Sequence, residues 1–319
     1  FDEYLIMGSD ANVPNVTFTF TVTPGAAADA TATSPRIEAG IGTPTAGTAV
    51  FGPTNNTYTT VQDNDSVTLG TNEKYAKQTV TVDFTGISFP APGIYRYVVT
   101  EAFDPVNGVA ADASATRTLD VHVRYAEGSE TELTISYYEM RNGEKKSAGF
   151  THEYSTNNLT LKKVVTGNQG DRNKQFTFTV TLTAQAGNQY KVVQGNDVSS
   201  LTVGEQGTVT GTFQIKHNET VEILGLAVGD TFTISENDYT TESYTTTYTV
   251  NGGDSVTGCD LDATQMGDTV MEIVFTNHRQ GTVPTGILME AEPYLILGAV
   301  VLAALAVLIV SGKKRHARG

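Results

Sequence analysis

Hydrophobic and polar residues alternate one by one along most of the chain. The alternating runs lie at residues 18–23, 79–84, 94–101, 116–125 and 132–140, and a second series follows in the C-terminal half. A period of two places successive side chains on opposite faces of a β-strand. Turn sequences such as Asn142-Gly143 separate the runs, and no amphipathic helix of useful length is visible in the pattern. The alternation predicts an all-β protein built from antiparallel β-sandwiches.

The chain also contains two copies of one pattern. Three short segments recur in the same order: FTFTVT at Phe18 and at Phe176, a strand-like run ending in Glu101 and in Glu236, and Phe-Thr-His or Phe-Thr-Asn at 150–152 and 275–277. Such self-similarity indicates a duplicated domain. We therefore expect two tandem immunoglobulin-like β-sandwich domains that form a rod, covering residues 1–153 and 159–279, with residues 280–319 as a separate C-terminal segment.

Composition agrees with this fold and excludes several classes of function. About fifty threonines and 31 glycines favour strands and turns. The net charge of −15 disfavours nucleic acid as a partner, because phosphates would be repelled. The single cysteine, Cys259, excludes an intramolecular disulfide and any cysteine-rich metal site. Stability must come from packing or from some other covalent bond.

Motifs for catalysis or for metal binding are also absent from the sequence. We find no GxSxG, HExxH or Walker motif, and the five histidines are dispersed without metal-ligand spacing. Asp63-Asn64-Asp65 lacks the glycine and the distal glutamate of a calcium loop, so we expect a solvated loop there. We predict that the protein is not an enzyme, requires no cofactor and has no metal site.

The C-terminus carries a membrane-type segment. Residues 294–310 form an uncharged apolar run that would span about 26 Å as a helix, close to the thickness of the hydrocarbon core. Four basic residues follow it, namely Lys313, Lys314, Arg315 and Arg318. Because basic clusters remain on the cytoplasmic side, the rest of the chain is expected outside the cell. A buried core helix is the alternative, and we expect a secretion signal to precede Phe1 in the natural protein.

Just before the apolar run stands the pentapeptide Thr282-Val283-Pro284-Thr285-Gly286. Together with the apolar span and the basic tail, it resembles the LPXTG-type cell-wall sorting signal of Gram-positive surface proteins. The resemblance implies that sortase cleaves between Thr285 and Gly286, removes the transmembrane helix and transfers the protein to the peptidoglycan cell wall. Val283 occupies the position of the motif's proline and Pro284 its variable position, so the identity of the sortase stays open.

Three polar residues of the second copy lie on strand faces that are otherwise apolar. Lys163 shares its face with Leu159, Leu161 and Val165, while Glu236 and Asn277 have similar neighbours in two later strands. Burial would lower the pKa of the lysine and raise that of the glutamate, which gives a neutral and therefore nucleophilic amine. The alternative is an ordinary Lys163–Glu236 ion pair. Lys162 points the opposite way and should be exposed.

The whole chain is similar in layout to two-domain Gram-positive backbone pilins of the streptococcal pilin isopeptide-linkage family. The resemblance implies an intramolecular isopeptide bond between Lys163 in LTLKKVVTG and Asn277 in VFTNHR. It also implies that Glu236 in TISENDY assists this self-catalysed reaction. A protonated Glu236 would polarise the Asn277 carboxamide and shuttle protons while ammonia leaves.

The first copy departs from the family pattern. Glu3 replaces the lysine of the family's Phe-Asp-Lys-Tyr-Leu start, and His152 replaces the asparagine, while Glu101 is retained. The first cross-link is therefore expected to be lost. Glu3 and His152 would form an ion pair or hydrogen bond in its place. A metal or hydrolytic site of Glu3, Glu101 and His152 remains as a further alternative.

Polymerisation by sortase requires an acceptor lysine on the neighbouring subunit. By resemblance this lysine precedes the last strand of the first domain, which indicates Lys145, or else Lys146; a solvated hairpin is the plain alternative. The predicted function is a structural subunit of a sortase-assembled covalent pilus that contributes to adhesion at the cell surface. Its expected partners are sortase, other pilin subunits, peptidoglycan and a host surface ligand. A wall-anchored or ancillary adhesin that is not polymerised is the alternative.

Overall fold

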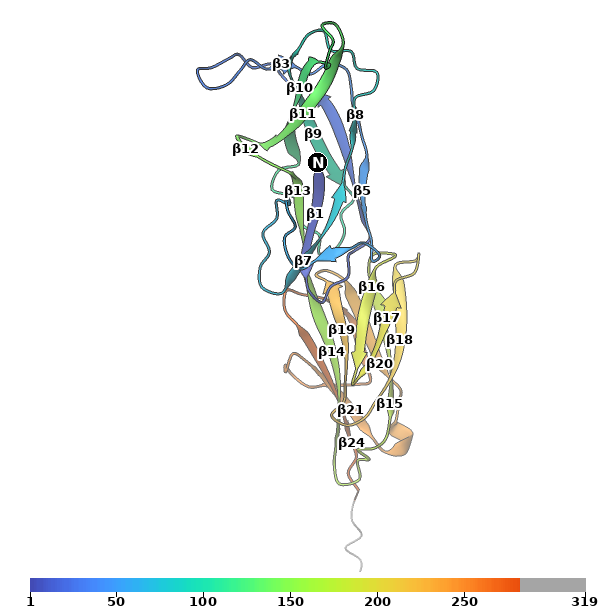
Figure 1. Ribbon diagram of the computed structural model, residues 1–319. Coiled ribbons are helices and arrows are strands. Elements are labelled where there is room, and N and C mark those ends of the chain that lie inside the picture. The colour runs from blue at the N-terminus through green and yellow to red at the C-terminus, as the bar shows by residue number, and fades with distance from the viewer. Residues whose placement is uncertain (282–319) are drawn as a thin grey trace, which may run out of the picture.

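The computed structural model describes residues 1–281 and contains two β-domains arranged end to end (Figure 1). Within this part of the chain the single helical element is a 3₁₀ turn, η1 (Thr240–Glu242). No helix in the same residues is long and apolar enough to span a membrane. The predicted all-β fold of two tandem sandwiches in an elongated molecule is confirmed for residues 1–281.

The first domain has a sheet of four strands in the order β13-β1-β7-β6 and a sheet of seven with the path β12-β11-β10-β9-β2-β5, where β3 also pairs with β9; β4 and β8 form a separate pair. Its strands are β1 (Asp2–Gly8), β2 (Val16–Pro24), β3 (Glu38–Ala39), β4 (Thr45–Ala46), β5 (Thr48–Phe51), β6 (Thr57–Tyr58), β7 (Glu73–Thr79), β8 (Val82–Asp83), β9 (Gly93–Phe103), β10 (Thr116–Tyr125), β11 (Leu133–Asn142), β12 (Lys145–Lys146) and β13 (Gly149–Tyr154).

The second domain has a sheet of seven strands in the order β17-β16-β19-β14-β24-β21-β22 and a sheet of four in the order β18-β15-β20-β23. Its strands are β14 (Thr156–Thr166), β15 (Phe176–Thr183), β16 (Gln189–Gln194), β17 (Asp197–Thr202), β18 (Thr208–Ile215), β19 (Thr220–Ala227), β20 (Thr231–Glu236), β21 (Thr245–Val250), β22 (Val256–Thr257), β23 (Asp260–Gln265) and β24 (Met271–His278).

The alternating runs form strands because each can bury one face. In β2, Phe18, Phe20 and Val22 are buried while the intervening threonines are exposed, and β15 repeats this pattern. Each buried large apolar side chain contributes about 1.5–3 kcal/mol relative to an exposed one. Each domain thereby acquires its own hydrophobic core between its sheets.

The first and last strands of each domain pair in parallel, which differs from the purely antiparallel sheets expected from the sequence. β1 pairs in parallel with β13, and β14 pairs in parallel with β24. Parallel neighbours need a long crossover connection, and here the rest of the domain supplies it. This closure places residues from the two ends of each domain side by side.

One local expectation was wrong, and another holds only in part. Residues 79–84 are not one strand, because β7 ends at Thr79 and the chain then crosses to pair β8 with β4. The loop at Asp63 is solvated only in part, because the Asp65 side chain is 1% exposed and forms an ion pair with Lys77. Tyr75 also donates a hydrogen bond to Asp65. Asp65 therefore fixes this loop against the sheet that contains β1 and β7.

The junction between the domains is a single residue, Ser155, between β13 and β14. Its backbone N–H donates to the Gly108 carbonyl at 2.8 Å, and its carbonyl accepts from the Val228 N–H at 3.0 Å. Gly108 has a φ of +75°, and a Cβ there would lie 2.6 Å from the Ser155 oxygen, so glycine is needed. These bonds on both sides of Ser155 hold the two domains in line.

Candidate functional site

In the second domain the structure brings Lys163, Glu236 and Asn277 together between the two sheets. Lys163 on β14 and Asn277 on β24 come from one sheet, and Glu236 comes from β20 of the other. The Lys163 Nζ atom lies 2.7 Å from Glu236 Oε1, and the Asn277 side-chain amide donates to the same oxygen at 3.2 Å. All three side chains are buried. An amine and a carboxamide thus meet at one carboxyl group.

The surroundings of Lys163 are apolar. Its Nζ atom lies 4.5 Å from the centroid of the Phe176 ring and 5.5 Å from that of Phe178. Burial lowers the pKa of Lys163 to about 8, although Glu236 opposes the shift. Burial likewise raises the pKa of Glu236, against the effects of Lys163 and Asn277. Both shifts favour the neutral amine and the neutral carboxylic acid.

Three polar atoms of this cluster lack a well-formed hydrogen bond: Glu236 Oε2, Asn277 Oδ1 and Lys163 Nζ, although Lys163 Nζ lies 2.7 Å from Glu236 Oε1. A buried polar atom without a partner destabilises a fold by about 1–3 kcal/mol. The carboxyl proton of a neutral Glu236 would satisfy the carboxamide oxygen after a small rotation. The arrangement is therefore suited to polarise the Asn277 carbonyl next to a free amine.

The first domain places Glu3, Glu101 and His152 in the same relationship. Glu3 pairs across to Phe150, and His152 follows two residues later on the parallel strand. In the second domain Lys163 pairs across to Phe275, and Asn277 follows two residues later. Glu101 lies opposite Phe20, and Glu236 lies opposite Phe178, at matching positions of the two FTFTVT repeats. The three repeated sequence motifs therefore occupy equivalent strand positions in the two domains.

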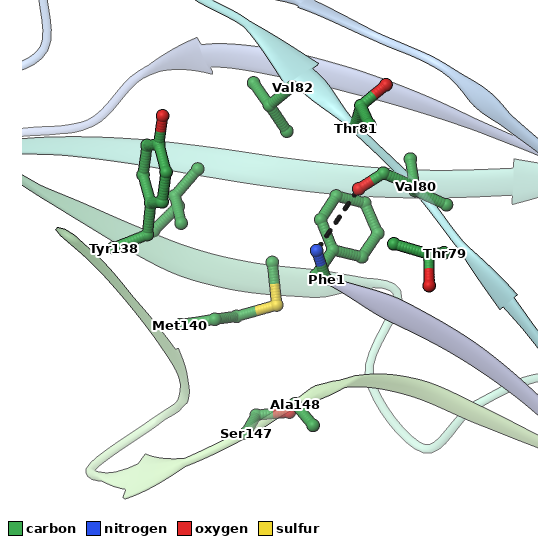
Figure 2. A pocket seen from close by; sticks show the side chains of 10 residues that line it. Phe1, Thr79, Val80, Thr81, Val82, Tyr138, Met140, Ser147 and Ala148 are labelled. Carbon is green, nitrogen blue, oxygen red and sulfur yellow. Dashed lines mark hydrogen bonds between the residues drawn. The ribbon is translucent and has the colours of Figure 1, made fainter. Parts of the chain in front are cut away.

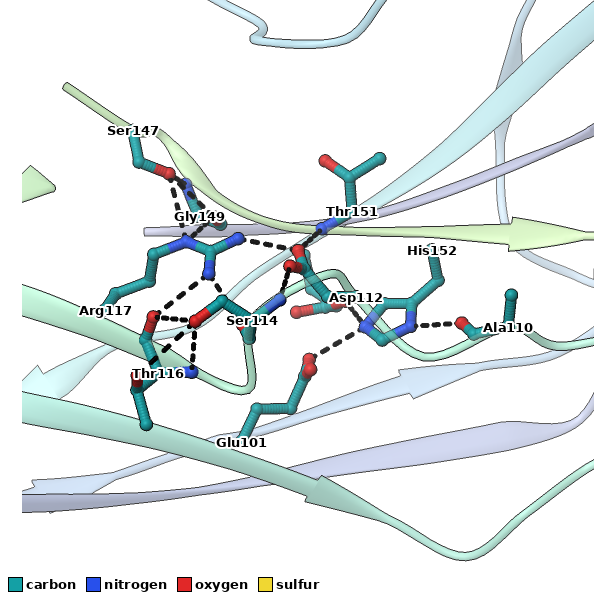
Figure 3. A network of polar contacts seen from close by, with 11 residues as sticks. Glu101, Ala110, Asp112, Ser114, Thr116, Arg117, Ser147, Gly149, Thr151 and His152 are labelled. Atoms are coloured by element: carbon teal, nitrogen blue, oxygen red, sulfur yellow. Dashed lines mark hydrogen bonds and ion pairs between the residues drawn. The ribbon is translucent and has the colours of Figure 1, made fainter. Parts of the chain in front are cut away.

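In this first-domain cluster, His152 contacts both carboxylates. Its Nε2 atom lies 3.0 Å from Glu3 Oε1. The same atom lies 2.9 Å from Glu101 Oε1, while Nδ1 lies 2.8 Å from the Ala110 carbonyl oxygen (Figure 3). Burial raises the pKa of Glu3 to about 8, against the effect of His152. Burial alone would lower the pKa of His152, but Glu101 and Glu3 raise it to about 10. The two carboxylates therefore favour the protonated form of His152.

A buried ion pair beside this cluster was not found by sequence analysis. Arg117 on β10 contacts Asp112 at 2.6 Å and donates to the Gly149 carbonyl at 2.9 Å, and Asp112 also accepts from the Thr151 N–H (Figure 3). Arg117 occupies an ordinary position in an alternating strand. Asp112 lies only five residues before it, but the contacts of this pair with Gly149 and Thr151 join segments that are remote in sequence. The network anchors β13 next to His152.

The candidate acceptor lysines lie on the surface. Lys145 and Lys146 form the short strand β12, and both are exposed; the Lys146 ammonium is 3.6 Å from Glu139. A surface hollow of about 500 Å³ lies next to this hairpin, with Phe1, Met140 and Ala148 among its lining residues (Figure 2). Lys145 is therefore accessible to solvent.

The remaining predicted site residues divide into two groups. Lys162 lies on the face opposite Lys163 but is half-buried, not fully exposed as expected. Lysine side chains commonly bury part of their stem while the ammonium group stays in water. Thr282, Val283, Pro284, Thr285, Gly286, the apolar span and the basic tail all lie outside the described residues.

Comparison with known proteins gives consistent matches for both domains. A family model described as the Spy0128-like isopeptide containing domain matches residues 6–155, and a model of a domain of unknown function, DUF7601, matches residues 157–279. A pilin of Streptococcus pyogenes serotype M1 is 32% identical over 309 residues, which cover 92% of this chain and 84% of that protein.

Solved structures show the same two-domain fold. The crystal structure of the major pilin from Streptococcus pyogenes matches with a TM-score of 0.59 at 25% identity, covering 88% of this chain and 99% of that one. The major pilin protein T3.2 from S. pyogenes serotype GAS13637 has the same fold, with a TM-score of 0.56 at 22% identity over 87% of this chain and 97% of that one. Because the sequence identity to the M1 pilin extends over most of both proteins, the chain belongs to the family of Gram-positive major pilins with a Spy0128-like isopeptide containing domain.

Proposed function

We propose that this chain is a shaft subunit that sortase joins covalently to its neighbours and whose second domain closes itself with a Lys163–Asn277 isopeptide bond. Membership of the family makes the chain a structural subunit of a cell-surface pilus, whose partners are other pilin subunits. The observation that carries the self-closure is the contact of both Lys163 Nζ and the Asn277 amide with Oε1 of the buried Glu236.

The chemistry follows from the neutral forms of the three groups. The uncharged Lys163 amine attacks the Asn277 Cγ atom, while the Glu236 carboxylic acid hydrogen-bonds to the carboxamide oxygen and stabilises the developing negative charge. A carbon–nitrogen bond to Lys163 forms, and the bond to the original amide nitrogen breaks. Glu236 transfers a proton from the attacking amine to the leaving nitrogen, which departs as ammonia. The reaction needs no added enzyme or oxidant.

The surrounding protein favours this reaction in two ways. The parallel pairing of β14 with β24 holds the reacting groups side by side, so little further entropy is lost on approach. The aromatic rings of Phe176 and Phe178 keep water away from the amine. The bond that results joins the first and last strands of the domain and closes a loop of more than a hundred residues.

The direction of the strands supports head-to-tail assembly. β14 starts at the junction between the domains, and β24 runs parallel to it, so β24 ends at the far end of the second domain. Lys145 and Lys146 precede β13, and β13 ends at the junction. The two lysines therefore lie farther from the second domain than the junction does (Figure 1). We propose that sortase cleaves after Thr285 and transfers its carboxyl group to the Lys145 amine of the next subunit. Peptidoglycan accepts the last subunit, and the exposed shaft contributes to adhesion to a host surface ligand.

The test of assembly uses the complete precursor, expressed in a Gram-positive host together with its pilus sortase. Boiled and reduced wall extracts of the unaltered protein should give a ladder of high-mass bands on an immunoblot. Lys145→Arg should abolish the ladder, because arginine is not a nucleophile, whereas Lys146→Arg should leave it unchanged. A single band from the unaltered protein would support an unpolymerised adhesin instead.

A further inference from the structure

The first-domain cluster is a buried acidic site that the amide chemistry does not use. Glu3 and His152 are almost completely buried, and Glu101 is 7% exposed. Neither carboxyl oxygen of Glu3 accepts a well-formed hydrogen bond, although Glu3 Oε1 lies 3.0 Å from His152 Nε2. Both oxygens of a buried side chain are thus available to a ligand. Buried carboxylates without hydrogen bonds are strongly unfavourable unless a cation or a proton neutralises them.

Protons alone do not satisfy the cluster. With Glu3 and Glu101 ionised and His152 protonated, the buried group retains one negative charge. A further proton on Glu3 would balance the charge and could be shared with Glu101, but the other Glu3 oxygen would still lack a well-formed hydrogen bond. A divalent cation would balance two carboxylates and a neutral imidazole, and it would give every free oxygen of Glu3 a partner.

We propose that Glu3, Glu101 and His152 bind a divalent transition-metal ion, with Zn²⁺ as the best match. The ligand atoms that the three residues offer all lie within 4.8 Å of one another. His152 Nε2, Glu101 Oε1 and the two oxygens of Glu3 supply four donors, which is the number that zinc takes in structural sites. Mixed imidazole and carboxylate donors suit zinc better than calcium or magnesium, which prefer oxygen ligands alone.

The orientation of the imidazole supports metal binding. The Ala110 carbonyl can only accept a hydrogen bond, so the His152 Nδ1 atom at 2.8 Å must carry a proton and donate it. In the neutral ring this places the lone pair on Nε2, which faces both carboxylates. A second-shell carbonyl that fixes the tautomer in this way is typical of histidines that bind metals.

The site would act as a structural cross-link. Glu3 lies on β1, His152 on β13 and Glu101 on β9, so one ion would join the first strand, the last strand and the facing sheet of the domain. These strands correspond to β14, β24 and β20, which carry the reactive trio of the second domain. The burial of the site leaves no open position for a substrate. The first domain would thus have a reversible metal cross-link where its neighbour has an irreversible amide.

Metal content provides the direct test. Purified protein is stripped with a chelator at mildly acidic pH, incubated with excess Zn²⁺ at neutral pH, passed through a desalting column and analysed for zinc. We expect one bound Zn²⁺ per chain, and cobalt loading should give the visible absorption of tetrahedral Co²⁺. Glu3→Gln, which keeps the side-chain size but removes the bidentate carboxylate, should lose this zinc. The control His278→Asn removes an exposed histidine of the second domain and should retain it.

Thermal unfolding of the unaltered protein supplies a second test that requires no variant. Zinc should raise the unfolding temperature of the first domain by several degrees, and a chelator should reverse the increase, while the transition of the second domain stays unchanged. Two results would each overturn the proposal. One is zinc retained equally by the unaltered protein and Glu3→Gln; the other is a first-domain transition that responds to neither zinc nor chelator.

Discussion

Lys163 and Asn277 lie on adjacent parallel strands, two residues apart in register, and contact the same oxygen of one buried glutamate. In the sequence the two residues are separated by almost the whole second domain, yet both side chains project into its core. A covalent bond at this point would tie together the two strands through which a pulling force enters and leaves the domain. That is the mechanical requirement of a shaft subunit.

The first prediction concerns the mass of the protein. The folded chain should be lighter than its sequence mass by one ammonia, because the Lys163 amine replaces the amide nitrogen of Asn277. Glu236→Ala should restore the full mass, since proton transfer is lost, while Glu205→Ala, an exposed glutamate of the same domain, should not. Intact mass spectrometry and a tryptic map measure both. A free Lys163 side chain in the folded, unaltered protein would contradict the proposed bond.

A second prediction concerns the stability of the second domain. A cross-link that closes a loop of roughly 100 residues lowers the entropy of the unfolded chain by an amount equivalent to about 4.7 kcal/mol. Asn277→Ala should remove this contribution and lower the unfolding temperature of the second domain by roughly 20 °C. Calorimetry measures the change, and the first-domain transition serves as the internal control. A shift of only a few degrees would show that the two strands are not covalently joined.

A third prediction restores the missing chemistry in the first domain. Glu3 and His152 have the same register as Lys163 and Asn277, and Glu101 is in place. The double change Glu3→Lys with His152→Asn should therefore create a second isopeptide bond, seen as the loss of a second ammonia. Addition of Glu101→Ala should prevent it, and each single change should leave the first domain without the bond. A double variant that folds but loses no second ammonia would show that the two pockets are not chemically equivalent.

A fourth prediction concerns pH in the presence of a chelator. His152, whose pKa is raised from 6.5 to about 10 by Glu101 and Glu3 against the effect of burial, contributes stability that is present below pH 6.5 and lost as pH rises toward 10. Burial raises the pKa of Glu3 from 4.5 to about 8, so Glu3 also contributes stability at low pH that is lost as the pH rises from 4.5 to 8. The free energy of unfolding of the first domain should therefore decrease as the pH rises from 6 to 9, by at most about 1.4 kcal/mol per pH unit for each proton.

Calorimetry across that pH range tests this, and Glu3→Gln should show a shallower decline because one titrating group is gone. Zinc-loaded protein should behave in the opposite way, because metal binding displaces protons and strengthens as pH rises. If the unfolding temperature of the metal-free first domain rises with pH, the roles assigned to the protonated forms of His152 and Glu3 would be contradicted.

A fifth prediction is that metal-free protein opens first in its first domain. Without a covalent bond or a bound ion, residues before Tyr154 retain the full entropy gain of unfolding. Hydrogen exchange in a chelating buffer should be faster in β1 and β13 than in β14 and β24. Zinc should slow exchange in β1 and β13 alone. Equal protection of the two strand pairs in the chelating buffer would argue that packing already compensates for the missing cross-link.

The sequence determined much of this structure, because the relevant signals are local. Alternation at residues 18–23 and 176–181 defines strands that can bury only one face, and their repetition defines two domains. The same period of two assigns Lys163 to an apolar face, while Glu236 and Asn277 follow from their own strands. Each of these inferences needs only the spacing of neighbouring residues.

Other features were decided only by the tertiary structure, because they depend on which distant segments meet. The parallel pairing of β1 with β13, the break in residues 79–84 and the burial of Asp65 follow from sheet assembly. The contacts of the Arg117–Asp112 pair with Gly149 and Thr151 of β13 likewise join segments remote in sequence. Histidine spacing gave no indication of a metal site, and the sequence grouped Glu3, Glu101 and His152 only through their alignment with the second copy and the family pattern. Folding alone converts these three residues into one buried cluster, because the closure of the domain places its first strand beside its last.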